Sequence, residues 1–200
     1  MENRYTIGLL THNGNKKEQL MYIQPAACSV KGLSYVIRSA LPGDAAALSD
    51  IRLQIDGETE YMDRERGEGF IDPAGFEEII RTDSEEARNL FLVAEAEGRL
   101  LGFCRCQGSA LKRLSHQVEF GICILKEFWG YGVGRKLLQE TISWADAAGV
   151  EKIGLHVLET NTTAIRLYET FGFEQEGLLR RDKRLSDGQF YNTIVMGRLK

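Results

Sequence analysis

The residues most able to do chemistry form a glycine-rich segment in the second half of the chain. A strand-like stretch over 118–124 leads into Trp129-Gly130-Tyr131-Gly132-Val133-Gly134-Arg135-Lys136. Glycine permits a positive φ and a close ligand, so consecutive main-chain N–H groups can converge on one anion. A helix that begins behind them adds unpaired donors and the positive end of a dipole. The segment therefore predicts a pyrophosphate site, with Arg135 and Lys136 in the first helical turn near a further phosphate.

The spacing of these glycines excludes two other phosphate-binding loops. A P-loop needs Gly-Lys-Ser/Thr, whereas Arg135-Lys136-Leu137 follows Gly134. A dinucleotide fingerprint places Gly-x-Gly-x-x-Gly near the start of a βαβ unit, whereas these glycines alternate strictly and follow several predicted strands. The alternative for the glycines taken alone is a simple tight turn.

A second group of residues lies about thirty positions further on. Asn161-Thr162-Thr163-Ala164-Ile165-Arg166-Leu167-Tyr168 follows a predicted strand over 152–158 and ends near Gly172 and Phe173. Asn161 and Tyr168 are two helical turns apart, so they face the same side of one helix. The structural alternatives are an N-cap role for Asn161 and a core position for Tyr168.

The combination of strand, glycine loop, helix, strand and Asn-capped helix resembles the GNAT N-acetyltransferase superfamily. The resemblance covers roughly residues 35–198. Within the superfamily, the sequence most resembles the bacterial polyamine and ribosomal-protein acetyltransferase branch. The sequence departs from the common pattern at Trp129, where many members carry Gln or Arg. This departure removes one side chain that could contact a phosphate.

The resemblance implies an enzyme that transfers the acetyl group of acetyl-CoA directly to an amine, without a covalent acetyl-Cys123. It implies that Tyr168 protonates the departing CoA thiolate and that Asn161 contacts the cofactor arm. It also implies main-chain contacts to the pantetheine arm and an N–H directed at the thioester carbonyl from Ile122, Cys123 and Ile124. The implied pyrophosphate contacts are Gly130, Tyr131, Gly132, Val133, Gly134 and Arg135.

The acceptor amine is mostly ammonium at neutral pH, so a base must remove its proton before attack. Glu119 qualifies because it lies on the strand before the loop, on the same face as Cys123. His156 also qualifies: it stands five residues before Asn161, where some N-terminal acetyltransferases of the superfamily carry a glutamate, and imidazole titrates near neutral pH. We favour Glu119 as the base. The alternatives are that Glu119 is only an exposed strand residue and that His156 is only a structural histidine.

An acidic segment follows the first predicted helix and borders the acceptor pocket in the GNAT fold. A negative rim would attract cationic amines, which favours a primary-amine acceptor such as a polyamine, a small amine or a protein N-terminus. The alternative is a solvated acidic loop. Other candidate functions for the chain are a non-catalytic acetyl-CoA-binding regulatory protein and an unrelated nucleotide-phosphate-binding module. The carboxylates concerned are Asp56, Glu58, Glu60, Asp63, Glu65 and Glu68.

The elements that position these residues follow the order β-α-α-β-β-β-α-β-α-β-β from Tyr35 onward. Period and capping signals predict a strand at 35–38, helices after Asp44 and Asp72, and a hairpin around 97–99. They then predict the two strand-helix pairs described above and a closing hairpin around 187–188. We expect one α/β (α+β) domain over 35–200 with the GNAT fold, a mixed, mostly antiparallel sheet flanked by helices. We interpret residues 1–34 as an N-terminal extension, ordered or partly disordered.

Composition narrows the class of protein further. The chain has 200 residues, 43% hydrophobic and 27% charged, with a formal net charge of −4. An acidic balance argues against nucleic-acid binding, and the absence of a long apolar run or leader-like start argues against membrane insertion and secretion. Four cysteines then indicate reduced thiols in a cytoplasmic protein. Cys104 and Cys106 lack a second pair of zinc spacing, so we expect no metal. By analogy with the family, the last hairpin could form a homodimer.

Overall fold

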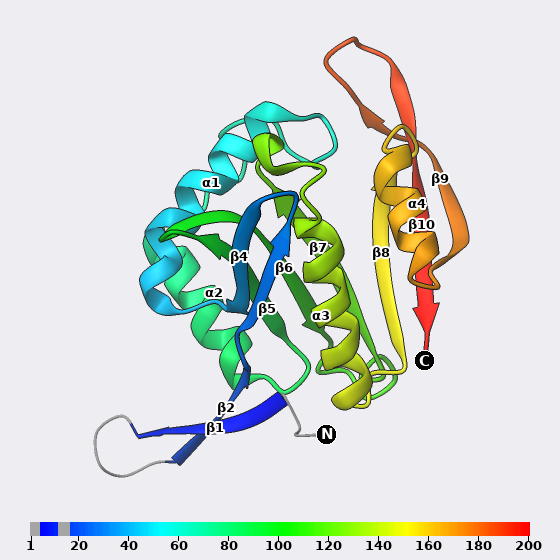
Figure 1. The fold of residues 1–200 in the computed structure, drawn as a ribbon. Helices are drawn as coiled ribbons and strands as arrows, with labels where there is room; N and C mark the ends of the chain where they lie inside the picture. Colours follow the sequence, from blue (N-terminus) through cyan, green and yellow to red (C-terminus); the bar gives the residue numbers. More distant parts are fainter. Residues whose placement is uncertain (1–4, 12–16) are drawn as a thin grey trace.

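Figure 1 shows the computed structural model, which describes residues 5–11 and 17–200. Its centre is an eight-stranded sheet in the order β3-β4-β5-β6-β7-β8-β10-β9. All neighbouring strands are antiparallel except β7 and β8, which confirms the predicted mixed, mostly antiparallel sheet. The strands are β3 (Ala26–Val30), β4 (Leu33–Ser39), β5 (Leu90–Ala96), β6 (Arg99–Gly108), β7 (Gln117–Ile124), β8 (Lys152–Leu158), β9 (Glu174–Arg184) and β10 (Phe190–Leu199).

Helices cover the two faces of the sheet, as Figure 1 shows. Helices α1 (Ala45–Glu58) and α2 (Pro73–Glu85) lie on one face, and α3 (Val133–Ala147) and α4 (Thr162–Thr170) lie on the other. Strand β5 is buried on both sides: Leu92 contributes to the core under α3, and Val93 to the core under α1 and α2. Among the described helices, none is long and apolar enough to span a bilayer.

Two of the predicted helix starts are confirmed by their caps, whereas the predicted cap Asp44 makes no cap hydrogen bond to α1 and pairs with Arg38 instead. The Asp72 side chain accepts a hydrogen bond from the Gly75 N–H, with Pro73 in the first position of α2. The Asn161 side chain accepts one from the Ala164 N–H at the start of α4. These side chains satisfy N–H groups that have no partner within a helix, which is why their types are visible in the sequence.

The N-terminal segment is more closely tied to the sheet than the sequence suggests. β1 (Tyr5–Thr11) and β2 (Lys17–Ile23) form a separate antiparallel pair. Strand β3, inside the stretch interpreted as an extension, is the edge strand of the main sheet and pairs with β4. Its sequence Ala-Ala-Cys-Ser-Val has little apolar alternation, so period alone does not reveal it. The part of the prediction that concerns disorder at 1–4 and 12–16 lies outside the described residues.

The parallel contact between β7 and β8 is short. Only three residue pairs join the strands, from Gln117–Lys152 to Glu119–Gly154. Beyond Glu119 the outer edge of β7 has no strand partner among the described residues, although its inner edge stays paired with β6 as far as Ile124. The fold thus leaves one strand edge open in the middle of the sheet.

Candidate active site

The open edge of β7 exposes alternate main-chain amides. The Leu125 N–H donates to the Leu101 carbonyl at 3.0 Å, so the main-chain amide of Leu125 faces β6. Successive main-chain amides of a strand point to opposite edges. The Cys123 amide therefore also faces β6, whereas the Ile122 and Ile124 amides face away from it. The Trp129 indole N–H donates to the Ile124 carbonyl at 2.9 Å on that outer side, which agrees with this assignment. Of the three residues predicted to contact the pantetheine arm, Ile122 and Ile124 have their amides on the open edge, whereas the Cys123 amide faces β6.

The glycine loop leads from this edge into α3. Gly130 and Gly132 have φ values of 81° and 76°, a region that side chains disfavour. The Lys136 N–H donates to the Gly132 carbonyl at 3.0 Å, so the N–H groups of Val133, Gly134 and Arg135 precede the first helical hydrogen bond. A Cβ on Gly134 would lie 2.9 Å from the Ile124 side chain, so this glycine lets the helix start against β7.

The loop has the shape and the donors to hold an anion such as a diphosphate. A Cβ built on Gly130 would meet only the Lys31 ammonium, 3.9 Å away. Beside Gly132 lies the hydroxyl of Tyr35, a buried donor with no hydrogen-bond partner in the described structure. Burial raises the pKa of Tyr35 to about 12, so the hydroxyl stays protonated. An open cradle and unsatisfied donors fit the phosphates of acetyl-CoA, and Lys31 and Tyr35 are residues that the sequence did not indicate.

The two cations predicted to lie near a phosphate are held in different ways. The Arg135 guanidinium lies 5.4 Å from the centre of the Phe171 ring, at the end of α4. The Lys136 ammonium donates to the Gln139 side chain at 3.2 Å. Both residues stand in the first turn of α3, as predicted. Arg135 is exposed and Lys136 is half-buried.

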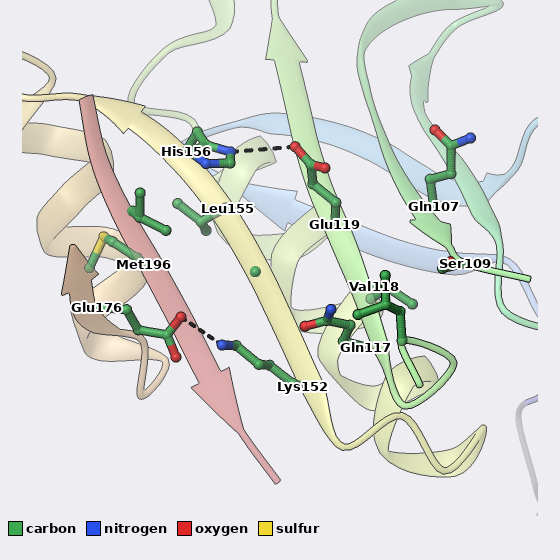
Figure 2. Close-up of a pocket in the computed structure, with 14 residues that line it drawn as sticks. Gln107, Ser109, Gln117, Val118, Glu119, Lys152, Leu155, His156, Glu176 and Met196 are labelled. Carbon is green, nitrogen blue, oxygen red and sulfur yellow. Dashed lines mark hydrogen bonds and ion pairs between the residues drawn. The ribbon is translucent and has the colours of Figure 1, made fainter. Parts of the chain in front are cut away.

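Glu119 and His156 come together in a cleft on the sheet face opposite α3. The His156 Nδ1 lies 3.4 Å from the Glu119 Oε1, and both side chains are exposed (Figure 2). Gly154 stands across from Glu119 in the register, so no side chain separates the pair. The cleft has a volume of about 390 Å³. The two candidates for the base are therefore neighbours at the last paired position of β7.

Other polar groups line the same cleft. The Lys152 ammonium and a Glu176 carboxylate oxygen lie 2.7 Å apart, across β10. Gln107 and Ser109 from β6 and the following loop face the cleft from its other side. The cleft thus offers a carboxylate, an imidazole and neutral hydrogen-bonding groups to a polar molecule.

Tyr168 and Asn161 lie on α4, behind the sheet. The Tyr168 ring packs edge-on against Phe120 at 6.4 Å and tilted against Phe173 at 5.8 Å. Burial, with the nearby thiols of Cys123 and Cys104, raises the pKa of Tyr168 above its ordinary value. Since Glu119 and Phe120 are consecutive, Glu119 and Tyr168 approach the edge of β7 from opposite faces. Asn161 acts as the N-cap, which agrees with one of its two predicted roles.

Trp129 forms a wall beside the open edge. Its ring stacks on Tyr61, with centroids 6.2 Å apart and planes 20° from parallel. Together with the indole hydrogen bond to Ile124, this contact fixes the start of the glycine loop against the segment after α1. The sequence marked Trp129 only as a departure from a motif, because its partner Tyr61 lies 68 positions earlier in the chain.

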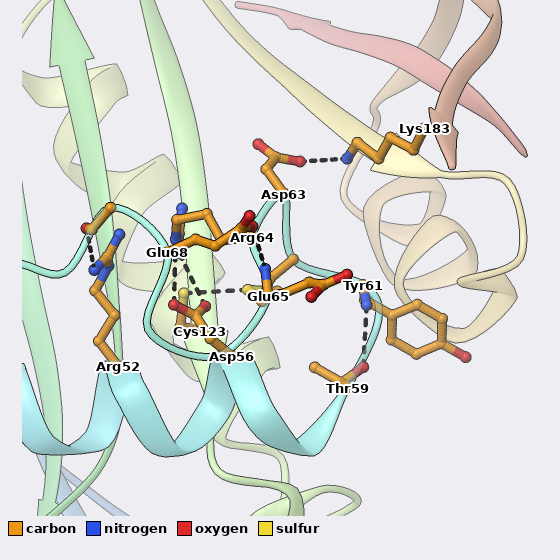
Figure 3. A network of polar contacts seen from close by, with 12 residues as sticks. Arg52, Asp56, Thr59, Tyr61, Asp63, Arg64, Glu65, Glu68, Cys123 and Lys183 are labelled. Atoms are coloured by element: carbon orange, nitrogen blue, oxygen red, sulfur yellow. Dashed lines mark hydrogen bonds and ion pairs between the residues drawn. The ribbon is translucent and has the colours of Figure 1, made fainter. Parts of the chain in front are cut away.

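The acidic segment begins inside α1, whose last turn contains Asp56 and Glu58, so it does not wholly follow the first helix as predicted. It is largely tied to the rest of the chain (Figure 3). Buried Asp56 accepts two hydrogen bonds from Arg64. Asp63 pairs with Lys183 of β9, and Glu60 accepts the Ser186 N–H at 3.0 Å. Glu58 accepts the Lys126 N–H and Glu68 accepts the Glu65 N–H, both at 2.8 Å. Five of the six carboxylates thus have hydrogen-bond partners within the chain, and two of them, Asp56 and Asp63, pair with a cation.

All four cysteines are free thiols. Cys104 and Cys106 are buried, and the Cys123 thiol lies 3.5 Å from the Met62 sulfur. Burial raises the pKa of Cys104 and of Cys123 to about 12, so each remains protonated at neutral pH. A protonated thiol is a poor nucleophile and a poor metal ligand, which favours packing roles for these residues.

Comparison with known proteins assigns the family. The sequence model of the acetyltransferase (GNAT) family matches residues 56–173. The L-amino acid N-acetyltransferase AaaT of Escherichia coli is 33% identical over 110 residues, which cover 54% of this chain and 67% of that protein. A crystal structure of a GNAT-family acetyltransferase from Streptococcus pneumoniae has a TM-score of 0.80 and 29% identity, covering 83% of this chain and 99% of the other.

The same fold occurs in a GNAT phosphinothricin acetyltransferase from Sinorhizobium meliloti, whose crystal structure contains acetyl-CoA. That structure has a TM-score of 0.73 and 21% identity, and it covers 82% of this chain and 88% of the other. The match of the family model spans the open edge of β7, the glycine loop and α4. This chain belongs to the acetyltransferase (GNAT) family and is an N-acetyltransferase.

Proposed function

We propose that this protein transfers the acetyl group of acetyl-CoA directly to a primary amine that binds in the cleft between β7 and β8. The proposal rests mainly on one observation. Strand pairing stops at Glu119 and Gly154, and the residues at that point are the Glu119–His156 pair, 3.4 Å apart. An open strand edge and a proton acceptor thus lie side by side.

The groups that would hold the carrier are main-chain donors and the glycine loop. Bound acetyl-CoA would supply the acetyl thioester. The Ile122 and Ile124 amides face the open edge and can pair with an extended arm as a strand would. The N–H groups of Val133, Gly134 and Arg135 at the start of α3 would bind the phosphates. A fixed N–H beside the thioester carbonyl stabilises the negative charge that develops on its oxygen.

Proton transfer is assigned to groups on the two faces of the sheet. Glu119 takes the proton of the acceptor ammonium, directly or through a water molecule, and His156 lies close enough to share that proton. Tyr168, kept protonated by burial, gives its proton to the departing thiolate. Attack of the amine on the acetyl carbon and loss of the thiolate thus leave an amide and a neutral thiol.

The acceptor we propose is a small amine, a polyamine or a protein N-terminus. The relative AaaT is named for acetylation of L-amino acids, and the α-amino group of an amino acid is a primary amine of this kind. The Glu119 carboxylate lies in the cleft between β7 and β8 and can attract the ammonium form of such an amine. Because most carboxylates of the acidic segment have internal partners, we place the acceptor in this cleft.

The test is a thiol-release assay over pH 6–9 with acetyl-CoA and a panel of L-amino acids, spermidine and peptides. We expect release with at least one amine, and a fall in kcat of about 10²-fold or more for Glu119→Gln. Glu176→Gln is the matched control, because it changes a carboxylate in the same cleft that is paired with Lys152. Its kcat should stay within about threefold of wild type.

His156→Gln separates the two candidates for the base. If Glu119→Gln keeps wild-type activity and His156→Gln loses it, the histidine is the base and our assignment of Glu119 is wrong. Wild-type activity in both variants excludes the pair. Tight acetyl-CoA binding without release to any amine would instead indicate a non-catalytic binding protein.

A further inference from the structure

The turn between β3 and β4 lies against the glycine loop, although about one hundred residues separate them in the sequence. Val30 lies 3.4 Å from the position of a Cβ on Gly132, and Tyr35 places its hydroxyl 3.7 Å from the same point. Lys31, at the tip of the turn, places its ammonium 3.9 Å from the corresponding point on Gly130. The β3–β4 hairpin therefore forms one side of the glycine loop that would hold the anion.

The backbone of this turn fixes the direction of Lys31. Val30 and Leu33 are paired, so the turn has two residues, Lys31 and Gly32, with φ values of 51° and 82°. Two positive φ values define the tight turn that suits the twist of a hairpin. A lysine is unusual at the first position, where asparagine or glycine is favoured. The chain thus keeps a cation at a strained position beside the cradle.

The charge of Lys31 has no partner within the described residues: its exposed ammonium takes part in no hydrogen bond or ion pair there. Gly130 leads into the α3 N-terminus, and the Tyr35 hydroxyl, which has no acceptor in the described structure, lies 3.7 Å from the position of a Cβ on Gly132. An ammonium, helix N–H groups and a hydroxyl thus lie along the glycine loop without an acceptor among the described residues, and an ammonium gains most from an anion in such a place.

We propose that Lys31 contacts the diphosphate of the bound acyl carrier, and that the β3–β4 hairpin is part of the substrate site. This inference rests on the proposed function, because it takes acetyl-CoA as the ligand. We assign the diphosphate in particular because Lys31 lies beside Gly130. Gly130 belongs to the glycine loop, whose amides would bind the diphosphate. Lys31 acts in binding and takes no part in proton transfer.

The test is the Kd of the purified full chain for CoA, measured by calorimetry at low and high salt. Lys31→Gly is the informative variant, because glycine adopts the positive φ more easily than lysine and so preserves the turn. We expect binding about tenfold weaker than wild type at low salt, a smaller difference at high salt, and recovery in Lys31→Arg. The melting temperature of Lys31→Gly without ligand should not fall.

Two ligand fragments and one control variant sharpen the test. The loss in Lys31→Gly should persist with dephospho-CoA, which keeps the diphosphate, and disappear with pantetheine, which lacks it. Lys112→Ala removes an exposed lysine beyond the other end of β7, so it should leave the Kd unchanged. Equal affinity of Lys31→Gly and wild type for CoA would overturn the inference. A loss that vanishes with dephospho-CoA, or an equal loss in Lys112→Ala, would overturn it too. Failure of the wild-type protein to bind CoA would refute the proposed function itself.

Discussion

Tyr168 shows at the scale of one residue how the fold selects a protonation state. Its side chain is 7% exposed and packs between Phe120 and Phe173. Burial disfavours the charged phenolate, so the pKa of Tyr168 lies above its ordinary value of about 10. The hydroxyl therefore carries its proton throughout the neutral range, as an acid for a thiolate must.

This state gives a prediction for Tyr168→Phe. We expect kcat to fall about 10²-fold, because the departing thiolate loses its proton donor, while the Kd for CoA stays unchanged. In wild type, kcat should show no decline from Tyr168 deprotonation below about pH 10, since a raised pKa moves that loss to higher pH. Steady-state kinetics against pH and calorimetry check both parts. A wild-type kcat in the variant would show that water or another group supplies the proton.

Single residues were predictable where type and spacing carry the chemistry. Glu119 and His156 lie on strands whose residue alternation gives their faces, and the cap at Asn161 fixes the phase of the helix that carries Tyr168. The sequence could not indicate Lys31. Its place beside Gly130 depends on a contact between segments far apart in the chain, which no local period encodes.

Strand β7 is the element on which the site depends, and Gly102 of β6 sets its position. A Cβ on Gly102 would lie 2.6 Å from the Cys123 carbonyl oxygen and 2.9 Å from the Ile124 Cα. Both are backbone atoms, so the strand itself would have to move. The close approach of β6 therefore holds the Ile122 and Ile124 amides where the open edge needs them.

We therefore expect Gly102→Ala to destabilise the protein by about 1–3 kcal/mol and to weaken CoA binding. Gly121→Ala is the control on the same strand, because a Cβ there meets no atom within 4 Å and its φ is not positive. Urea unfolding should separate the two variants, with calorimetry reporting the Kd. Equal stability of Gly102→Ala and wild type would mean that β6 and β7 can separate without cost.

At the scale of elements, the order from β4 to β10 follows from period and punctuation. Asp72-Pro73 marks the start of α2, and the positive φ of Gly98 accompanies the predicted hairpin between β5 and β6. The edge strand β3 escaped prediction, since its short and partly polar side chains lie at the margin of the core. Its pairing is set by the neighbouring strand and by the turn at Lys31–Gly32.

Across the whole molecule, the segment after α1 and the β9–β10 hairpin are joined to each other. Lys183 pairs with Asp63 (Figure 3), and the Ser186 N–H donates to Glu60. The same segment brings Met62 against Cys123 of β7. Two parts of the chain more than one hundred residues apart are thus held together, and one of them contacts β7.

Reversing one charge tests this link. We expect Lys183→Glu to raise KM for the amine about two- to fivefold, because the introduced carboxylate would repel Asp63 and release the segment. The Kd for CoA should not change, since the glycine loop lies elsewhere. The double variant Lys183→Glu/Asp63→Lys restores an attractive pair and should recover KM. An unchanged KM in the single variant would show that the contact has no part in acceptor binding.

The brief ladder between β7 and β8 has a consequence for the cooperativity of unfolding. Three residue pairs connect the larger part of the sheet to the three-stranded part formed by β8, β10 and β9, although α3 and α4 share one apolar core. Sub-global opening can therefore begin at this seam, where amides such as Ile122 and Ile124 lack ladder protection against hydrogen exchange. A substrate arm bound along the seam would act as a temporary ninth strand of this sheet. The two parts of the sheet would then be joined while substrate is bound and would separate more easily after it leaves.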